Sequence, residues 1–131
     1  MKDQSKQVVA SFLNAVQTGD NAKLAELLSP EVTWEQPGNN QVSGIKKSNM
    51  EVFQMVGKMF EISGNTLRLT EIKSITVHND EIAALLRWEA SKTSGEKLAV
   101  DNIDVYRVQD GQIISAKIFT SDIEAENEFW S

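Results

Sequence analysis

The spacing of the apolar residues changes at Gly64-Asn65, and this change constrains the fold more than any other feature of the chain. Before it, most apolar residues recur at intervals of three and four, which is typical of helices that bury one face. After it, apolar and polar residues alternate, which is typical of strands. The sequence therefore predicts an α+β fold in which the helices cover one face of a sheet.

Two consecutive helices are predicted at the start of the chain. The first is indicated by four apolar residues at helical spacing, Val9, Phe12, Leu13 and Val16. Gly19 supplies a left-handed stop, and Asp20 caps the second helix. That helix is expected to end at Ser29-Pro30, because proline cannot continue the hydrogen-bond ladder. A short strand follows from Val32 to Gln36.

A third helix and four strands complete the prediction. Polar residues from Pro37 to Gly44 indicate a surface loop, and Ser48 with Glu51 makes a capping box for a helix that runs to about Ile62. Short hairpins then join four alternating strands: Leu67 to Val77, Ile82 to Ala90, Lys97 to Val108 and Ile113 to Ser121. The acidic tail from Asp122 to Ser131 is expected to be solvated, with Phe129 and Trp130 covering either a cavity mouth or a partner subunit.

Composition limits the classes of function. The 131 residues are expected to form one domain, residues 1–131, and the net charge of −6 with scattered basic residues argues against nucleic-acid and membrane partners. Cysteine is absent and His78 is the single histidine, so we expect neither a thiolate nor a multi-histidine metal site. Acid–base chemistry would rest on carboxylates. The polar start and the lack of a long apolar run predict a cytoplasmic protein.

Asp104 stands out because it lies in an apolar strand. Alternation places it on one face with a largely apolar group of neighbours: Leu98, Val100, Asn102, Tyr106 and Val108. Burial disfavours the charged form of a carboxyl group and raises its pKa, and a neutral carboxylic acid can donate a hydrogen bond to a developing enolate. The alternative is a structural aspartate that is satisfied by a neighbouring backbone amide, tyrosine or arginine.

Four short segments occur in the order and spacing of a known superfamily. They are Gly19-Asp20, Val32 to Pro37 with Gly44 after the loop, Ile103 to Arg107, and Asp110-Gly111. With them the chain resembles, over essentially its whole length, the nuclear transport factor two-like superfamily, which includes ketosteroid isomerases and SnoaL-type polyketide cyclases. The resemblance implies a cone-shaped, cystatin-like fold, in which a curved antiparallel sheet and the N-terminal helices enclose a pocket.

The same resemblance suggests which residues serve the site. Ketosteroid isomerases use a tyrosine on the first helix, a base aspartate on the first strand and a second aspartate on a later strand. Their positions in this chain are Phe12, Gln36 and Asp104, so the donor tyrosine and the base are missing and conventional ketosteroid isomerase activity is disfavoured. SnoaL-type cyclases carry an acidic residue at the end of the last strand, which here is Asp122.

The candidate catalytic residues are therefore Asp104 and Asp122. The expected ligand pocket is lined by Phe12, Trp34, Gln36, Phe53, Trp88, Asn102, Ala116, Ile118 and Thr120. Gln36 is expected either to orient a ligand carbonyl or to act as a polar cap at the end of its strand. No metal and no cofactor are expected, since cyclases of this type work without either.

Two kinds of function follow from this site. The first is a SnoaL-like, cofactor-independent isomerase or cyclase that acts through an enolate on a hydrophobic ketone. The alternative is a non-catalytic module of the same fold that binds a small hydrophobic molecule or acts as a dimeric interaction scaffold. A homodimer is expected through the outer sheet face, where the sequence predicts an apolar band of Ile103, Val105, Ile113 and Phe119.

Overall fold

The computed structural model describes residues 2–131 and contains the predicted helices and long strands. In chain order the elements are α1 (Lys2–Thr18), α2 (Asn21–Leu27), β1 (Leu28–Gln36), β2 (Gly44–Lys46), α3 (Asn49–Ile62), β3 (Arg68–His78), β4 (Glu81–Ser91), β5 (Lys97–Gln109), β6 (Gln112–Thr120) and α4 (Ile123–Phe129). The α+β class is confirmed. Among the described residues, no helix combines the length and apolar character that crossing a membrane requires.

All six strands form one sheet in the order β2-β1-β6-β5-β4-β3. Antiparallel hairpins join β3 to β4, β4 to β5 and β5 to β6, as the alternation predicted. The pairing of β1 with β6 is parallel, so the sheet is mixed and mostly antiparallel, whereas the sequence predicted an antiparallel sheet. A parallel pair of this kind needs a long crossover, and here the intervening chain supplies it.

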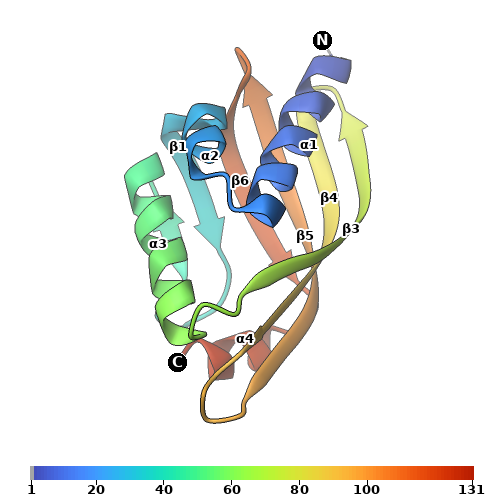
Figure 1. Ribbon diagram of the computed structural model, residues 1–131. Helices are drawn as coiled ribbons and strands as arrows, with labels where there is room; N and C mark the ends of the chain where they lie inside the picture. Colours follow the sequence, from blue (N-terminus) through green and yellow to red (C-terminus); the bar gives the residue numbers. More distant parts are fainter. Residues whose placement is uncertain (1) are drawn as a thin grey trace.

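Helices α1, α2 and α3 lie on the same face of the curved sheet, with α1 across β3 to β6 and α3 beside β1 and β2 (Figure 1). Most of their ends follow the predicted signals, but α2 ends at Leu27, before the predicted stop at Ser29-Pro30, which lies inside β1. Gly19 has a φ of 73°, and the Asp20 side chain accepts a hydrogen bond from the Lys23 amide at 3.1 Å. The Ser48 hydroxyl caps α3 by accepting from the Glu51 amide at 3.2 Å.

An irregularity in β6 corrects one prediction about its faces. Val108 pairs with Ile113 and Arg107 pairs with Ser115, so Ile114 is an extra residue in β6. Such a bulge bends its strand and changes which side chains face inward. Ile113 is consequently buried instead of lying in the predicted outer apolar band.

Three other boundaries differ from the prediction. β1 begins at Leu28 and contains Pro30, which fits because the pairing with β6 is interrupted between Leu28 and Thr33. The predicted loop ends in β2, a strand of three residues that pairs with β1. The predicted solvated tail contains the short helix α4, which lies at one end of the sheet (Figure 1).

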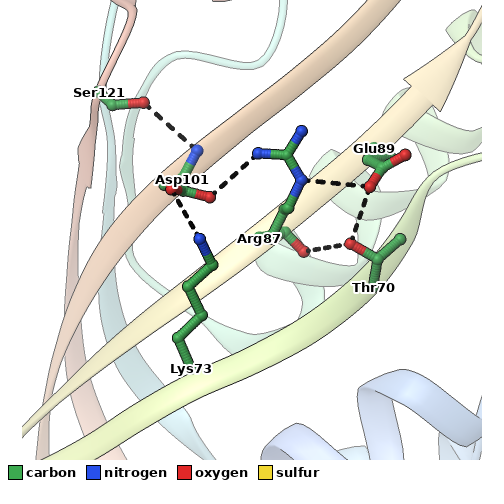
Figure 2. Close-up of polar contacts among 6 residues, drawn as sticks. All are labelled: Thr70, Lys73, Arg87, Glu89, Asp101 and Ser121. Carbon is green, nitrogen blue, oxygen red and sulfur yellow. Dashed lines mark hydrogen bonds and ion pairs between the residues drawn. The ribbon is translucent and has the colours of Figure 1, made fainter.

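A network of charged side chains covers part of the outer sheet face on β3, β4 and β5 (Figure 2). Asp101 lies at its centre, 3.0 Å from Lys73 Nζ and 3.3 Å from Arg87 Nη1. Arg87 also contacts Glu89 at 3.3 Å, and Glu89 accepts from the Thr70 hydroxyl at 3.2 Å. The apolar side chains Ile103 and Phe119 lie exposed on the same side of β5 and β6.

Candidate functional site

A cavity of about 490 Å³ lies between the helices and the inner face of the sheet. Residues from α1, α2 and α3 form one wall, and residues from the long strands form the other. Most of the lining side chains are aliphatic or aromatic, and within residues 2–131 none of them is basic. This volume and an apolar wall are typical of sites for small organic molecules.

Three aromatic rings from three different elements meet at one side of the cavity. Phe12 of α1 lies edge-on to Tyr106 of β5, with 5.8 Å between ring centroids. Trp34 of β1 lies 6.2 Å from Tyr106 and 6.4 Å from Phe12. These separations are those of favourable aromatic pairs, so the rings form a rigid apolar wall beside Asp104.

Asp104 lies in the middle of β5 with its carboxyl group almost completely removed from water, at 2% exposure. Its Oδ2 accepts a hydrogen bond of 2.7 Å from the Tyr106 hydroxyl, while its Oδ1 is buried without a partner among the described residues. Burial raises the pKa of Asp104 to about 7; the Tyr106 bond lowers it, and the negative charge of Glu126 raises it. The group thus exchanges its proton near neutral pH.

Tyr106 holds Asp104 in place. Burial raises the pKa of Tyr106 well above its ordinary value, and the neighbouring Asp104 adds to this shift. The phenol therefore stays protonated and donates to Asp104. A tyrosine hydroxyl thus comes from β5, two residues after the aspartate, while the first-helix position where the resemblance placed a tyrosine carries Phe12.

Gln36 and Asn102 are the neutral polar groups of the cavity. Gln36 is buried at the end of β1, and its Oε1 accepts from the Trp34 indole nitrogen at 3.0 Å. Asn102 precedes Asp104 by two residues on the same strand face, and its Oδ1 is buried without a partner among the described residues. Gln36 is therefore held by a hydrogen bond to a wall residue, whereas the side-chain oxygen of Asn102 is not held by any described residue.

Glu126 is a second buried carboxyl group. The expectation of a solvated acidic tail holds for Glu124 and Glu128, which are exposed, but is wrong for Glu126. Its side chain on α4 is 4% exposed and belongs to the cavity lining. Its Oε1 accepts from the Trp130 indole nitrogen at 3.3 Å, and its Oε2 has no partner within residues 2–131. A signal was present in the sequence: Glu126, Phe129 and Trp130 share one face of a helical turn.

Helix α4 is held against the loop that follows β1. The Asn127 side-chain oxygen accepts from the Asn39 amide at 2.7 Å and from Asn40 Nδ2 at 2.9 Å. The Trp130 carbonyl accepts from the Gln41 amide at 3.3 Å. Gly38 leaves the space for this contact, since a Cβ there would lie 2.5 Å from the Asn127 oxygen.

Seven of the predicted pocket residues lie in the cavity wall together with Asp104: Phe12, Trp34, Gln36, Phe53, Trp88, Asn102 and Ile118. Ala116 and Thr120 are not among the lining residues. Ala116 lies between Trp34 and Tyr106 in the sheet, and these larger side chains cover it. Thr120 is half-buried at the end of β6, where its hydroxyl accepts from the Asp122 amide at 3.3 Å.

Asp122 lies outside the cavity, although it was a candidate catalytic residue. Its side chain is exposed and accepts from the Ala125 amide at 3.0 Å, which makes it the N-cap of α4. This contact begins the helix that carries Glu126.

Within residues 2–131, no group of three or more histidine, cysteine or acidic residues has the arrangement of a metal site.

Comparisons with known proteins agree with this architecture. A family model described as a SnoaL-like domain matches residues 9–116. A structure of a protein of unknown function with a cystatin-like fold from Xanthomonas campestris is 33% identical, with a TM-score of 0.92 over 97% of this chain and 98% of that one. An NTF2-like (nuclear transport factor two-like) protein from Burkholderia xenovorans LB400 is 14% identical, with a TM-score of 0.83 over 100% and 98% of the two chains.

A third structure has a more specific name. A putative SnoaL-like polyketide cyclase from Jannaschia sp. CCS1 is 18% identical, with a TM-score of 0.76 over 92% of this chain and 87% of that one. At these identities the last two structures establish likeness of fold alone. The family match contains Asp104 and ends before Glu126.

Proposed function

Because the chain belongs to the SnoaL-like domain family, we propose that it binds a hydrophobic ketone in its cavity and stabilises the enol or enolate form. Asp104 donates the hydrogen bond to the ligand oxygen. The observation that carries this proposal is the buried Oδ1 of Asp104, which has no partner within residues 2–131 and belongs to a cavity-lining residue. A buried polar atom without a partner is costly, so a ligand that satisfies it gains affinity.

The protonation of Asp104 supports this role. With a pKa of about 7, a large fraction of Asp104 carries a proton at neutral pH and can donate through Oδ1. Tyr106 donates to Oδ2 at the same time and fixes the orientation of the carboxyl group. A preorganised donor of this kind in an apolar site is the arrangement that stabilises oxyanions.

The reaction class that fits is a cofactor-independent isomerisation or cyclisation through an enolate, as the resemblance to SnoaL-type cyclases implies. Conventional ketosteroid isomerase activity remains disfavoured, since Gln36 cannot act as a base and Phe12 cannot donate. The second candidate function is ligand binding without catalysis. The position of Gln36, where the base is expected, favours that candidate.

Binding of 2-naphthol tests the oxyanion site, because this molecule has the shape and oxygen position of a bicyclic enol. We expect the wild-type protein to bind it and Asp104→Leu to bind it about 10-fold more weakly, which corresponds to the loss of one hydrogen bond. 2-Methylnaphthalene is the matched control and should bind both proteins equally. The change in naphthalene fluorescence measures both affinities. Absence of 2-naphthol binding, or equal loss for both ligands, would contradict the proposal.

We also propose that a second copy of the chain covers the outer sheet face. Ile103 and Phe119 are 46% and 48% exposed there, and large apolar side chains on a surface commonly mark an interface. The neighbouring network contains both signs of charge, with Lys73 and Arg87 close to Asp101. Two copies related by a two-fold axis can therefore pair opposite charges around the apolar centre.

Sedimentation velocity tests this dimer. We expect the wild type to sediment as a dimer and Phe119→Lys to sediment as a monomer, because the new ammonium group would be desolvated at the interface. Lys58→Ala, on α3 and away from the outer sheet face, is the control and should remain dimeric. A monomeric wild type at micromolar concentration would refute the interface.

A further inference from the structure

The cavity brings together two carboxyl groups from segments that are distant in the sequence. Asp104 comes from the middle of β5, and Glu126 comes from the short helix α4. Each is almost fully buried, each has one oxygen that accepts a hydrogen bond, and each has a second oxygen without a partner among the described residues. Burial is the main cause of the raised pKa of Asp104, and the negative charge of Glu126 acts in the same direction.

The two groups have different donors. Asp104 is bound by a tyrosine hydroxyl at 2.7 Å and Glu126 by an indole nitrogen at 3.3 Å. The two carboxyl groups therefore belong to the same apolar cavity but have different hydrogen-bond partners, which allows them to take different roles in one site.

A purely structural role does not account for Glu126. A buried glutamate that serves packing or helix capping has its oxygens satisfied, and leaving one oxygen unpaired is costly. The charge of Glu126 has no basic partner either, because no basic residue lines the cavity within residues 2–131. Since Oε2 is buried without a partner among the described residues and Glu126 belongs to the cavity lining, a ligand in the cavity is the candidate partner for this oxygen.

We propose that Glu126 is the base that removes a proton from the carbon next to the ligand carbonyl, with Asp104 as the acid at the carbonyl oxygen. This assignment rests on the proposed function, since it requires a ketone whose oxygen is bound by Asp104. In this assignment the base lies on α4, after the last strand, and not on the first strand at the position of Gln36.

The step balances without a cofactor. The Glu126 carboxylate forms a bond to the α-hydrogen, the electrons of the C–H bond become a carbon–carbon double bond, and the carbonyl electrons move to oxygen. That oxygen takes its hydrogen bond or proton from Asp104. Exchange results when protonated Glu126 trades this proton for one from solvent before it delivers a proton back to the α-carbon. Delivery of the proton to the γ-carbon of an unsaturated ketone gives its conjugated isomer instead. Nothing is oxidised or reduced.

The cavity also limits the substrate class. Anionic substrates are disfavoured, because two carboxyl groups face the ligand and no lining residue within residues 2–131 is basic. The aromatic wall of Phe12, Trp34 and Tyr106 favours flat, fused-ring skeletons. Uncharged bicyclic or tricyclic ketones with acidic α-hydrogens are therefore the expected class.

Deuterium exchange of 2-tetralone tests the base directly. This bicyclic ketone is the keto counterpart of the enol that 2-naphthol imitates, and NMR in deuterated buffer follows the loss of its α-hydrogens. We expect the wild type to accelerate exchange above the buffer rate. Glu126→Gln should lower the protein-catalysed rate by about 100-fold or more, as loss of a general base does. Glu126→Asp should retain part of it.

Two controls show whether a lower exchange rate in Glu126→Gln comes from loss of the base or from misfolding or weaker binding. Glu124→Gln, an exposed change on the same helix, should exchange like the wild type. Glu126→Gln should still bind 2-naphthol, which shows that the cavity is intact. Binding of 2-naphthol without accelerated exchange by the wild type, or equal exchange by Glu126→Gln, overturns the base and leaves the binding proposal standing. Absence of both binding and exchange overturns both.

Discussion

Asp104→Asn is expected to gain stability relative to the wild type as the pH rises from 4 to 8. The pKa of Asp104 is about 7 in the folded protein, against an ordinary value of 3.8 for the unfolded chain. Between these values the folded state retains a proton that the unfolded state has released. The free energy of unfolding of the wild type therefore falls by about 1.4 kcal/mol per pH unit in this window.

The loss of stability is confined to the pH range between the two pKa values of Asp104. Below pH 4 both states are protonated, so Asp104 contributes no slope; above pH 7 both are ionised, and the penalty for the buried charge is complete. Asparagine carries no charge at any pH, so the difference between the two proteins should grow to roughly 4 kcal/mol. Urea unfolding at several pH values measures it. Curves that stay parallel from pH 4 to 8 would show that Asp104 is not desolvated.

Tyr106→Phe is expected to keep the pH dependence of the free energy of unfolding that Asp104→Asn removes. The Tyr106 hydroxyl lowers the pKa of Asp104, so its removal should extend the slope to higher pH instead of abolishing it. Phenylalanine keeps the ring that packs against Phe12 and Trp34. A variant that behaves like Asp104→Asn would contradict the hydrogen bond between the two residues.

Trp130→Ala is expected to destabilise the protein by about 3–5 kcal/mol, the usual cost of removing a large buried aromatic side chain. Trp130 is 2% exposed, stacks edge-on with Phe129 at 4.8 Å and donates to Glu126. Its loss removes these contacts and leaves Glu126 without a donor. Since the free energy of unfolding of a domain of this size is roughly 5–15 kcal/mol, Trp130→Ala should remove a large part of it.

Trp130→Phe separates packing from hydrogen bonding. It keeps most of the apolar contact and removes the indole N–H, so about 1–3 kcal/mol should be lost. Urea unfolding at pH 7 measures both variants. A loss below about 1 kcal/mol for Trp130→Ala would mean that α4 does not pack against the cavity end.

The helices and hairpins were predictable because their signals are local. Gly19 and Asp20 separate α1 from α2, and Asp110-Gly111, with φ values of 53° and 77°, closes the hairpin between β5 and β6. The inward face of β5 followed from strict alternation, and this placed Asp104 in the cavity wall. Each of these features depends on residues within one turn or one strand.

The features that were not predicted depend on contacts between distant segments. The parallel pairing of β1 with β6 joins residues about 80 positions apart, and no local pattern encodes it. The bulge at Ile114 inverted the expected orientation of Ile113. Glu126 was missed because α4 has only seven residues and is stabilised by its contacts with the loop around Asn40.

The docking of α4 has a consequence for how this site can diversify. The acid, Asp104, is built into a strand whose neighbours depend on its register, so it is difficult to move. Glu126 lies on a short helix outside the sheet, attached largely through Asn127 and Trp130. Substitution of Glu126 alone can therefore remove the second carboxyl group while every strand pairing stays intact. The two carboxyl groups of the proposed site can thus change independently of one another.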